Sequence, residues 1–375
     1  MNELTRRISE SDCKLIKPLK IIYVGPAHDG TCKARKRALE ALGHTVRVIN
    51  PCDFLDSLPW LLATTEKKLQ FGPATYRINR SLLRTAAEED HDWVWIDKNV
   101  FVWPSTIKEL IAIGLFLIHH LTDDFMNPNQ PLRHYRQAIP MFHVHLSSNV
   151  FNVEELKGLG VRHAIQTHLG FDPEFCCPGG QPPLPVEEFK TDVVFVGHWR
   201  KHLDEFILPI IDQGVKVALW GQGWEKSPQR KKLTDRAKFR LASDEEYPSI
   251  LASAKIALCF LSHENRNTST GRSFEIPAVG TFMLAERTDE HESFYVEGKE
   301  VEFFEQPAEL LEKIRYYLSN EEERTRIARA GHDRASTSGY TYFDRVVMDI
   351  NNILPIYEEF LKSDRRSQSV IALKE

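Results

Sequence analysis

Hydrophobic positions along this chain fall into short runs separated by polar segments with helical spacing. From Lys20 the sequence reads KIIYVG (20–25), a polar turn, the helical pattern ARKRALEALG and a second apolar run, HTVRVIN. Short apolar runs bounded by turn residues are typical of buried strands in a parallel α/β sheet. The same pattern predicts further strands at residues 93–97, 115–120, 144–148 and 163–168.

The alternation of strand and helix begins again after residue 190. Strands are predicted at TDVVFVG, VKVALWG, KIALCF, TFMLAE and VEFF, with helices at HLDEFILPIIDQG, EEYPSILASA and AELLEKIRYYLS and near Gly271. Between the two halves lies CCPGGQPPLPVEEF (176–189), which is too rich in proline and glycine for a helix or a central strand. We therefore expect two doubly wound, Rossmann-like α/β domains facing across a cleft.

The expected boundaries follow from this pattern. The last long helical pattern contains Pro355, which predicts either two helices or one kinked helix. We expect the C-terminal helices to pack back on the first domain. The proposed segments are a first domain (1–178), a linker (179–190), a second domain (191–345), C-terminal helices (346–363) and a tail (364–375).

Composition and charge exclude several classes of protein. The 375 residues suit two domains, and 53 acidic against 48 basic residues give a net charge of −5, so no basic footprint suggests nucleic acid. The first twenty residues lack the continuous apolar core of a signal peptide, and the longest apolar run, LIAIGLFLI, is too short to cross a bilayer. A cytoplasmic location is therefore expected.

Cysteine and histidine spacing gives little support for a metal site. The six cysteines form no C-x-x-C pair, so free thiols are expected. Histidines occur at His119-His120 and at His143-x-His145. Adjacent histidines on a strand point to opposite faces, and no acidic third ligand has a suitable spacing. We therefore expect no bound metal.

The segment HENRNTSTGRSFEIPAVG carries the strongest candidate chemistry. Small polar residues precede a helical run, and the N-terminus of a helix binds phosphate through its free N–H groups. Arg272 in the first turn could pair with a diphosphate, and Glu275, one turn further on, could accept two hydrogen bonds from a ribose diol. The alternative is an ordinary surface pair of Arg272 with Glu275 behind a simple helix cap.

A family resemblance favours the first alternative. Glu275, Ala278 and Gly280, followed by YVEGKEVEFF and PAELLEKIRYYLSNEEERTRIARAG, resemble the end of the nucleotide-sugar domain of GT-B glycosyltransferases. EIPAVGTFMLAERTDEHESFYVEGKE is similar to the spore-maturation, CgeB-like group of glycosyltransferases. So are VGPAHDG, WIDKNVFVWPSTIKEL, HHLTDDF, SSNVFNVEELKGLG and GFDPEF in the first half. The resemblance spans roughly residues 20 to 350 and implies a GT-B fold.

The resemblance also implies a donor site on the second domain, for a nucleotide-diphosphate sugar and without a cofactor. Glu275 would hold the ribose. The phosphates would meet Ser269, Thr270, Gly271 and Arg272, together with Gly197, His198, Arg200 and Lys201 of VGHWRK. Gly221 and Trp224 of GQGW would lie near the base, with Trp224 either packing on it or acting as a structural lid.

One position departs from the family pattern. Retaining members of the superfamily often carry a second glutamate, which would fall at position 267, where this chain has Asn267. An amide can hydrogen-bond a sugar hydroxyl but cannot stabilise a developing positive charge. Glu264 could substitute if the loop had a different shape. The stereochemical course therefore stays open, and inversion is one alternative.

An inverting enzyme needs a base that takes a proton from the acceptor hydroxyl. Loops after strands of the first domain offer three pairs of residues that could supply this base or bind the acceptor. They are His28 and Asp29, Asp97 and Lys98, and Asp123 and Asp124. The last pair ranks first, because two adjacent acids raise each other's pKa, and His28 ranks second. Each of these residues could instead only cap a turn. Arginine and helix N–H groups would stabilise the departing diphosphate without a metal.

Three functions compete on these observations. The leading one is a glycosyltransferase that builds a glycan, glycolipid or small-molecule glycoside on an acceptor hydroxyl. The others are a sugar-nucleotide epimerase and a nucleotide-sugar-binding protein that has lost catalysis, the latter motivated by Asn267. Peripheral membrane contact through KARKR (33–37) is a further possibility, although a solvated helix face explains that run equally well.

Overall fold

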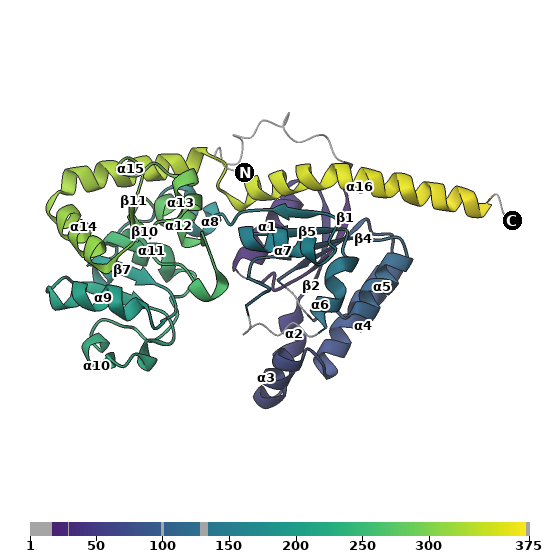
Figure 1. The fold of residues 1–375 in the computed structure, drawn as a ribbon, viewed down its shortest axis with the longest axis horizontal. Helices are drawn as coiled ribbons and strands as arrows, with labels where there is room; N and C mark the ends of the chain where they lie inside the picture. Colours follow the sequence, from purple (N-terminus) through teal and green to yellow (C-terminus); the bar gives the residue numbers. More distant parts are fainter. Residues whose placement is uncertain (1–16, 29, 99–100, 128–133, 373–375) are drawn as a thin grey trace. The chain divides into compact units, whose positions relative to one another are not determined.

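The chain forms two compact units. The computed structural model describes residues 17–28, 30–98, 101–127 and 134–372, with side chains described up to residue 363. The N-terminal unit contains the described residues up to His168, the short segment His263–Asn267 and the residues from Tyr342 onward. The C-terminal unit contains Leu169–Ser262 and Thr268–Thr341. Figure 1 shows the elements of both units.

A six-stranded parallel sheet forms the centre of the N-terminal unit, with strand order β2-β1-β3-β4-β5-β6. Its strands are β1 (Lys20–Val24), β2 (Thr45–Ile49), β3 (Trp93–Asp97), β4 (Phe116–Leu121), β5 (Val144–Ser147) and β6 (Ala164–Gln166). Trp93 and Trp95 pack into one apolar cluster, while Val94 and Ile96 pack into another. Both faces of the sheet are therefore covered, as the continuous apolar runs predict.

Helices from distant parts of the sequence cover the two faces. One face packs against α1 (Gly30–Ala41) and α16 (Tyr342–Ala372). The other packs against α4 (Pro73–Glu88), α5 (Pro104–Ala112), α6 (Tyr135–Ala138) and α7 (Val150–Gly158). The short helices α2 (Pro51–Leu55) and α3 (Trp60–Leu69) precede α4.

The C-terminal helix belongs to the core of the N-terminal unit. α16 is one continuous helix with Pro355 inside it. Its side chains Val346, Ile350, Ile353 and Leu354 are buried in the same cluster as Trp93. The expectation that the C-terminal residues pack back on the first domain is therefore confirmed, and of the two forms considered, a single helix is observed. α16 continues through residues 364–372, which the sequence pattern assigned to a tail.

The C-terminal unit repeats the architecture with a five-stranded parallel sheet, in the order β11-β10-β9-β7-β8. Its strands are β7 (Thr191–Val196), β8 (Val217–Trp220), β9 (Ala254–Cys259), β10 (Phe282–Glu286) and β11 (Glu302–Phe304). Val193 and Phe195 pack on one face, and Val194 and Val196 pack on the other. The predicted doubly wound α/β class is therefore confirmed for both units, and every strand predicted from the sequence overlaps a strand of the structure.

The helices of the C-terminal unit divide between the two faces in the same way. α9 (Leu203–Asp212) and α14 (Pro307–Ser319) pack on the Phe195 side. α11 (Glu246–Ala252), α12 (Arg272–Val279) and α13 (Asp289–Phe294) pack on the other side. α15 (Glu321–Thr337) contributes to both clusters. The remaining short helices are α8 (Pro173–Cys176) and α10 (Arg230–Leu233).

The start of the proline- and glycine-rich segment is anchored in this core. Cys176 and Cys177 are buried, and the Cys177 thiol donates to the Ala278 carbonyl oxygen at 3.1 Å. The described cysteines Cys32, Cys52, Cys176, Cys177 and Cys259 form no disulfide with one another, and Cys13 lies outside the described residues. Among the described residues, no helix combines the length and the apolar character that a bilayer crossing requires.

Candidate functional site

The backbone before α12 forms the helix start that the sequence predicts. Gly271 is the N-cap residue. The amides of Ser273 and Phe274 donate to the carbonyl oxygens of Thr270 and Gly271, both at 3.0 Å, which leaves the amides of Gly271 and Arg272 as the open N–H groups of this helix start. Just before it, the amide N–H of Thr270 donates to Ser273 Oγ at 3.0 Å, and Ser269 is buried. The helix N-terminus carries a partial positive charge. The start of α12 therefore has the local geometry that binds an anion.

Arg272 is held at the carboxyl ends of two neighbouring strands. Its Nη2 donates to the Phe260 carbonyl oxygen at 2.8 Å, its Nη1 donates to the Val196 carbonyl oxygen at 3.3 Å, and its guanidinium lies 5.3 Å from the Phe195 ring centre. The buried Nε of Arg272 has no hydrogen-bond partner among the described residues. The cation is thus fixed in position beside the start of α12 by groups that do not neutralise its charge.

Glu275 faces an aromatic partner. Its Oε2 accepts a hydrogen bond from the Tyr247 hydroxyl at 2.6 Å, and the Tyr247 ring stacks on Phe175 with centroids 5.4 Å apart. Burial raises the pKa of Glu275, while the Tyr247 hydrogen bond and the charge of Arg272 act in the opposite direction. The alternative of an ordinary Arg272–Glu275 surface pair is not observed: the described hydrogen bonds of both side chains go to other groups.

Tyr247 and Phe175 were not identified from the sequence. Phe175 comes from α8 and Tyr247 from α11, so neither is close to α12 along the chain. The tyrosine in EEYPSILASA fits the apolar face of a helix, and nothing in its spacing points to Glu275. A strand-and-helix pattern gives the order of the elements but does not show which side chains of different helices are in contact.

The loop after β7 brings further positive groups towards Arg272. Arg200 and Arg272 both lower the pKa of His198 electrostatically, after the larger effect of its burial. The three side chains are therefore near enough to interact. Gly197, which precedes them, and the exposed Lys201 lie in the same loop. His198 therefore lies near Arg272 of α12 within the C-terminal unit.

A tight glycine turn after β8 supports this loop. Gly221 has φ of +128°, and a Cβ on it would lie 2.2 Å from the Gly197 carbonyl oxygen. Trp224 is fully buried, and its Nε1 donates to the same oxygen at 3.1 Å. A buried indole offers no free face for a base to stack on. Of the two roles predicted for Trp224, the structural one fits its surroundings.

Asn267 and Glu264, the two candidates for the missing glutamate, lie in the segment His263–Asn267. That segment belongs to the N-terminal unit, whereas Thr268 and α12 belong to the C-terminal unit. Glu264 is exposed and Asn267 is half-buried. Asn267, which replaces the glutamate of the family pattern, is therefore the residue after which the chain passes from the N-terminal to the C-terminal unit.

The two predicted bases after β4 have different surroundings. Asp124 is buried, and its carboxylate accepts hydrogen bonds from Arg266 Nε at 2.6 Å and Arg266 Nη2 at 2.8 Å, and from Asn152 Nδ2 at 2.7 Å. Burial alone would raise the pKa of Asp124, but these hydrogen bonds outweigh it and lower the pKa. The expectation that its neighbour raises this pKa is therefore wrong for Asp124. Asp123 is exposed, with Asn265 Nδ2 at 3.4 Å from its Oδ1.

Arg266 organises this part of the N-terminal unit. Besides Asp124, its guanidinium binds Glu155 Oε1 at 2.8 Å and Glu155 Oε2 at 2.9 Å. The Asn149 side chain donates to the Asn265 carbonyl oxygen at 2.7 Å. Arg266 itself has φ of +46°, which is unusual for a residue with a side chain. The segment is therefore docked by a charged and amide network that spacing along the sequence does not indicate.

The other predicted acceptor-side residues are also placed by the structure. His28 is exposed, and its Nε2 lies 3.1 Å from Asp53 Oδ1, while its predicted partner Asp29 lies outside the described residues. Asp97 is fully buried, accepts two hydrogen bonds from Arg35, at 2.6 and 2.8 Å, and accepts a third from the Tyr23 hydroxyl. Against the effect of burial, Arg35 holds the pKa of Asp97 well below its usual range. Lys98 is exposed and has φ of +55°.

The paired histidines are core residues. His120 and His145 are buried, and burial lowers their pKa to about 3 and about 4. His145 Nε2 lies 2.8 Å from the Ile139 carbonyl oxygen, and His143 Nδ1 accepts from the Leu117 amide at 2.9 Å. Neutral imidazoles with backbone partners are explained by packing alone. They form no metal-ligand group in the part of the chain that the structure describes.

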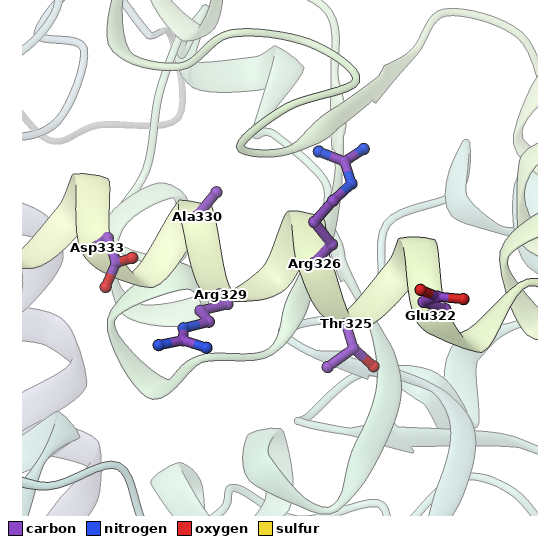
Figure 2. A pocket seen from close by; sticks show the side chains of 6 residues that line it. All are labelled: Glu322, Thr325, Arg326, Arg329, Ala330 and Asp333. Atoms are coloured by element: carbon purple, nitrogen blue, oxygen red, sulfur yellow. The ribbon is translucent and has the colours of Figure 1, made fainter.

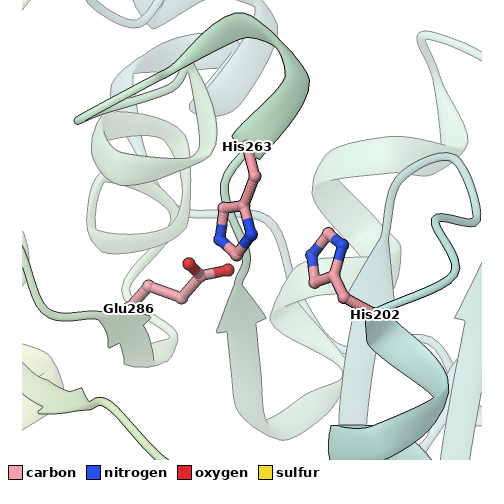
Figure 3. Close-up of side chains that lie close together, drawn as sticks. All are labelled: His202, His263 and Glu286. Atoms are coloured by element: carbon pink, nitrogen blue, oxygen red, sulfur yellow. The ribbon is translucent and has the colours of Figure 1, made fainter.

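A different group of possible ligands occurs elsewhere. His202, His263 and Glu286 each offer one ligand atom, and these atoms lie within 4.8 Å of one another (Figure 3). Glu286 Oε1 already accepts a hydrogen bond from the Leu261 amide at 2.9 Å. No spacing in the sequence suggested this combination of residues.

One surface pocket lies apart from all the predicted residues. It has a volume of about 510 Å³ and is lined by side chains of α15 alone (Figure 2). They are Glu322, Thr325, Arg326, Arg329, Ala330 and Asp333. Two acidic residues at the ends of this helix face flank two arginines, and no residue of the α12 site lines the pocket. We assign it no part in the candidate site.

Comparison with known proteins gives a family model and a set of folds. A model described as "Glycosyl transferase-like" matches residues 200–350, and no curated protein sequence matches the chain. The HepE protein of Anabaena, solved in complex with UDP, is 13% identical over 90% of this chain and 100% of its own, with a TM-score of 0.58.

Two further solved structures have similar folds. Sucrose-phosphate synthase from Thermosynechococcus elongatus is 11% identical over 92% of this chain and 100% of its own, with a TM-score of 0.61. A putative UDP-N-acetylglucosamine 2-epimerase from Listeria monocytogenes is 14% identical over 92% and 97%, with a TM-score of 0.55. The chain therefore has the two-domain fold of the GT-B glycosyltransferases, and its residues 200–350 match a glycosyl transferase-like domain.

Proposed function

We propose that this protein is a glycosyltransferase that moves a sugar from a nucleoside-diphosphate sugar to an acceptor hydroxyl. The observation that carries the proposal is that Arg272, fixed on the Phe260 carbonyl oxygen at the start of α12, lies one helical turn before the carboxylate of Glu275, with His198 near enough for Arg272 and Arg200 to lower its pKa. Positive charge and open N–H groups suit a diphosphate, and a carboxylate suits a ribose diol.

Each group has a proposed role at the donor. The backbone of Ser269, Thr270 and Gly271 binds the phosphates, and Arg272 stabilises the charge on the departing diphosphate. Gly197 and Gly221 allow the neighbouring loops to approach, and Lys201 adds charge. Glu275 holds the ribose, and the Tyr247 hydroxyl fixes the orientation of its carboxylate. Because HepE was solved with UDP and with UDP-glucose, a uridine nucleotide is the first donor to test.

On the acceptor side, we assign the proton transfer to Asp123. Its neighbour Asp124 is occupied by Arg266 and Asn152, which leaves Asp123 as the exposed carboxylate of the pair. A base must reach the acceptor hydroxyl, so exposure favours Asp123. His28, exposed beside Asp53, is the second candidate. With Asn267 at the position of the second glutamate, inversion is the proposed course.

The class of product and catalysis without a metal ion are also proposals. The CgeB-like resemblance favours synthesis of a glycan, a glycolipid or a glycosylated small molecule in the cytoplasm. Arg272 and the start of α12 supply the positive charge that a metal ion supplies in other transferases, so turnover should persist in a chelator. Activity that is lost in EDTA and restored by a divalent cation would overturn this part.

The basic run KARKR is a weak candidate for membrane contact. Arg35 is buried in its ion pair with Asp97, and Lys36 pairs with Glu40 at 3.0 Å. The run therefore does not present a continuous basic surface.

The donor site is tested by thermal stability in the presence of UDP, GDP, dTDP, CDP and CMP. One nucleotide should stabilise the protein selectively, and Glu275→Ala should abolish this shift, whereas Glu312→Ala, a change of an exposed glutamate on α14, should keep it. Because the pKa of Glu275 is raised, nucleotide binding should strengthen as the pH rises through that pKa. Absence of stabilisation by all five nucleotides at millimolar concentration would contradict the proposal.

Tyr247→Phe tests the partner of Glu275. Loss of a hydrogen bond to a carboxylate should weaken nucleotide binding roughly tenfold. Tyr316→Phe is the matched control, since the Tyr316 hydroxyl makes a similar 2.7 Å hydrogen bond to the half-buried Glu323, which comes from α15 and not from the site. Equal nucleotide affinities in the two variants would remove Tyr247 from the site.

An epimerase is the second candidate, favoured by the likeness to the Listeria structure. The two reactions differ in their need for an acceptor. Interconversion of the donor sugar without an acceptor would identify an epimerase, and consumption of the donor only with an acceptor would identify a transferase. Nucleotide binding without either reaction would identify the non-catalytic alternative that Asn267 suggests.

A further inference from the structure

A buried serine and a buried histidine are hydrogen-bonded to each other at the start of α12. Ser273, in the first turn of α12, and His291, in α13, are both fully buried. Ser273 Oγ lies 2.7 Å from His291 Nε2, and the other ring nitrogen, Nδ1, lies 2.7 Å from the Glu286 carbonyl oxygen. Because neither side chain reaches the surface, neither can contact a substrate itself.

The direction of these hydrogen bonds follows from their partners. A carbonyl oxygen can only accept, so the hydrogen of a neutral His291 ring is on Nδ1 and is donated to Glu286. Nε2 then carries a lone pair and accepts the hydrogen of the Ser273 hydroxyl. Burial lowers the pKa of His291, against the opposing effects of the Glu286 carbonyl and of the charges of Glu290 and Glu286. The neutral ring is therefore the form present near neutral pH.

The Ser273 hydroxyl connects this histidine to the turn before α12. Its oxygen accepts the Thr270 amide at 3.0 Å, and the Ser273 amide donates to the Thr270 carbonyl oxygen, also at 3.0 Å. The first of these bonds is the one that a glutamate or glutamine makes in a capping box, with a serine in its place. The two bonds enclose Gly271 and Arg272, so they fix the backbone that carries the open amides of this helix start.

A serine can make this bond reliably only if its hydroxyl is oriented. A hydroxyl rotates, and its hydrogen has Cys259 Sγ, 3.7 Å away, as a weaker alternative partner. His291 Nε2 is the stronger acceptor, and it holds the hydrogen on the side of the ring. The lone pairs of Ser273 are then directed towards the Thr270 amide.

A second set of bonds ties the beginning of the turn to α13. Thr268 Oγ1 donates to Glu290 Oε2 at 2.6 Å, and Thr288 Oγ1 donates to the Thr268 carbonyl oxygen at 2.7 Å. The Thr288 oxygen also accepts the His291 amide at 3.0 Å, which caps α13. The first turn of α13 therefore holds the turn before α12 at both ends.

We infer that His291 is a positioning residue for the diphosphate site, and that it acts through the Ser273 hydroxyl on the turn that carries the Gly271 and Arg272 amides. This inference rests on the proposed function, because it requires the phosphates to bind at this turn. Donors that are already fixed lose less conformational entropy when a ligand binds.

The alternative is a histidine that only fills the core. The His291 ring lies parallel to the Phe303 ring, with centroids 6.0 Å apart. If packing were its whole role, replacing His291 would change the free energy of unfolding but leave the affinity for a nucleotide unchanged. The affinity of folded variants therefore separates the two roles.

The inference is tested by calorimetric titration of the full chain with UDP, well below the unfolding temperature. Ser273→Ala removes the hydroxyl and should weaken UDP binding roughly tenfold. His291→Asn keeps a donor near the position of Nδ1 but is too short to reach Ser273, so it should weaken binding by a similar factor. His291→Gln places an amide oxygen near the position of Nε2 and should retain most of the affinity, because it can still accept the Ser273 hydroxyl.

A double-mutant cycle tests whether the two residues act together. If His291 acts through Ser273, the chain with both Ser273→Ala and His291→Asn should bind UDP about as well as the weaker of the two single variants. Independent effects would multiply to a loss of roughly a hundredfold, and that result would overturn the inference.

His145→Asn is the matched control for a general loss of stability. His145 is also fully buried, and its Nε2 lies 2.8 Å from the Ile139 carbonyl oxygen, but it belongs to the N-terminal unit. Its replacement should lower the thermal stability and leave the affinity for UDP unchanged. A loss of affinity in this control as large as in His291→Asn would overturn the inference.

Failure of this inference and failure of the proposed function give different results. Full UDP affinity in Ser273→Ala and His291→Asn, together with a loss in Glu275→Ala, would keep the donor site and remove the role of His291. A parent protein that binds none of UDP, GDP, dTDP, CDP and CMP would overturn both.

Discussion

At the scale of single residues, the carboxylate pair Asp123 and Asp124 shows how neighbours can have opposite roles. Asp124 is enclosed by Arg266 and Asn152, whereas Asp123 reaches solvent one residue earlier. A buried acid that accepts several hydrogen bonds from charged and amide donors favours its ionised form. Asp124 therefore positions the segment that carries Arg266, whereas Asp123 has the exposure that the proposed base requires.

This difference predicts distinct effects of the two asparagine variants. Asp124→Asn should lower the free energy of unfolding by about 1–3 kcal/mol, because it leaves the Arg266 guanidinium without its closest carboxylate. Asp123→Asn should change stability by less than about 0.5 kcal/mol and should lower turnover if Asp123 is the base. Denaturant unfolding and initial rates on both variants measure this.

The pH dependence of the Asp124 effect has a definite sign. Its pKa is lowered by folding, so the ion pair contributes fully above the unfolded value of about 3.9 and is lost as the pH falls through the folded value. The stability difference between the parent and Asp124→Asn should be constant near neutral pH and shrink in strong acid. A difference that grows on acidification would contradict this account.

At the scale of elements, helix packing can outweigh helix propensity. Gly331 lies inside α15, where alanine is intrinsically favoured by about 1 kcal/mol. A Cβ on Gly331 would, however, lie 2.3 Å from the Glu300 carbonyl oxygen. The backbone of the loop before β11 therefore requires a glycine at this point of α15.

We predict that Gly331→Ala lowers the free energy of unfolding by about 2 kcal/mol or more, despite the better propensity of alanine. Gly158 in α7 is the matched control, since no atom lies within 4 Å of a Cβ placed there. Gly158→Ala should be neutral or stabilising by up to about 1 kcal/mol. Thermal unfolding of the two variants measures this difference. If Gly331→Ala were more stable than the parent, the loop at Glu300 would have to move away from the added Cβ, and the prediction would be wrong.

The strands were the most predictable elements, and side-chain partners the least. A buried parallel strand needs apolar residues on both faces, so WVWID and TDVVFV are recognisable without any partner. Arg266 and Asp124 are separated by 142 positions, and no local rule relates them. Glu275 and Arg272 could be identified because one helix turn carries both, whereas Tyr247 and Phe175 come from other helices.

At the scale of the whole molecule, sequence order and structural unit do not coincide. The strand-and-helix pattern divides the chain into successive halves, with the C-terminal helices expected on the first. The structure confirms this for α16 and adds residues 263–267 to the N-terminal unit, which the pattern did not indicate. Its apolar cluster joins Ile350 and Ile353 of α16 to Trp93 and Trp95 of β3. Such a cluster depends on where a distant helix docks, and periodicity alone shows only that the helix has an apolar side.

We therefore predict that residues 17–168 alone do not form a cooperative unit. Without α16, the side chains on one face of the sheet would be exposed to water. Adding residues 342–363 through a flexible linker should restore a cooperative thermal transition, and the same linked chain carrying Ile350→Asp should not show one. Heat-induced unfolding followed by circular dichroism distinguishes the three chains, and a cooperative transition of residues 17–168 alone would contradict the prediction.

The place of α16 after the C-terminal unit in the sequence also sets an order of assembly on the ribosome. Residues up to Thr341 complete the C-terminal unit, but the N-terminal unit lacks α16 until the whole C-terminal unit has been synthesised. The half that is synthesised first is thus the half that is completed last. During that interval the uncovered face around Trp93 and Phe116 is exposed to other nascent chains, which makes it a natural target for chaperones that bind apolar surface.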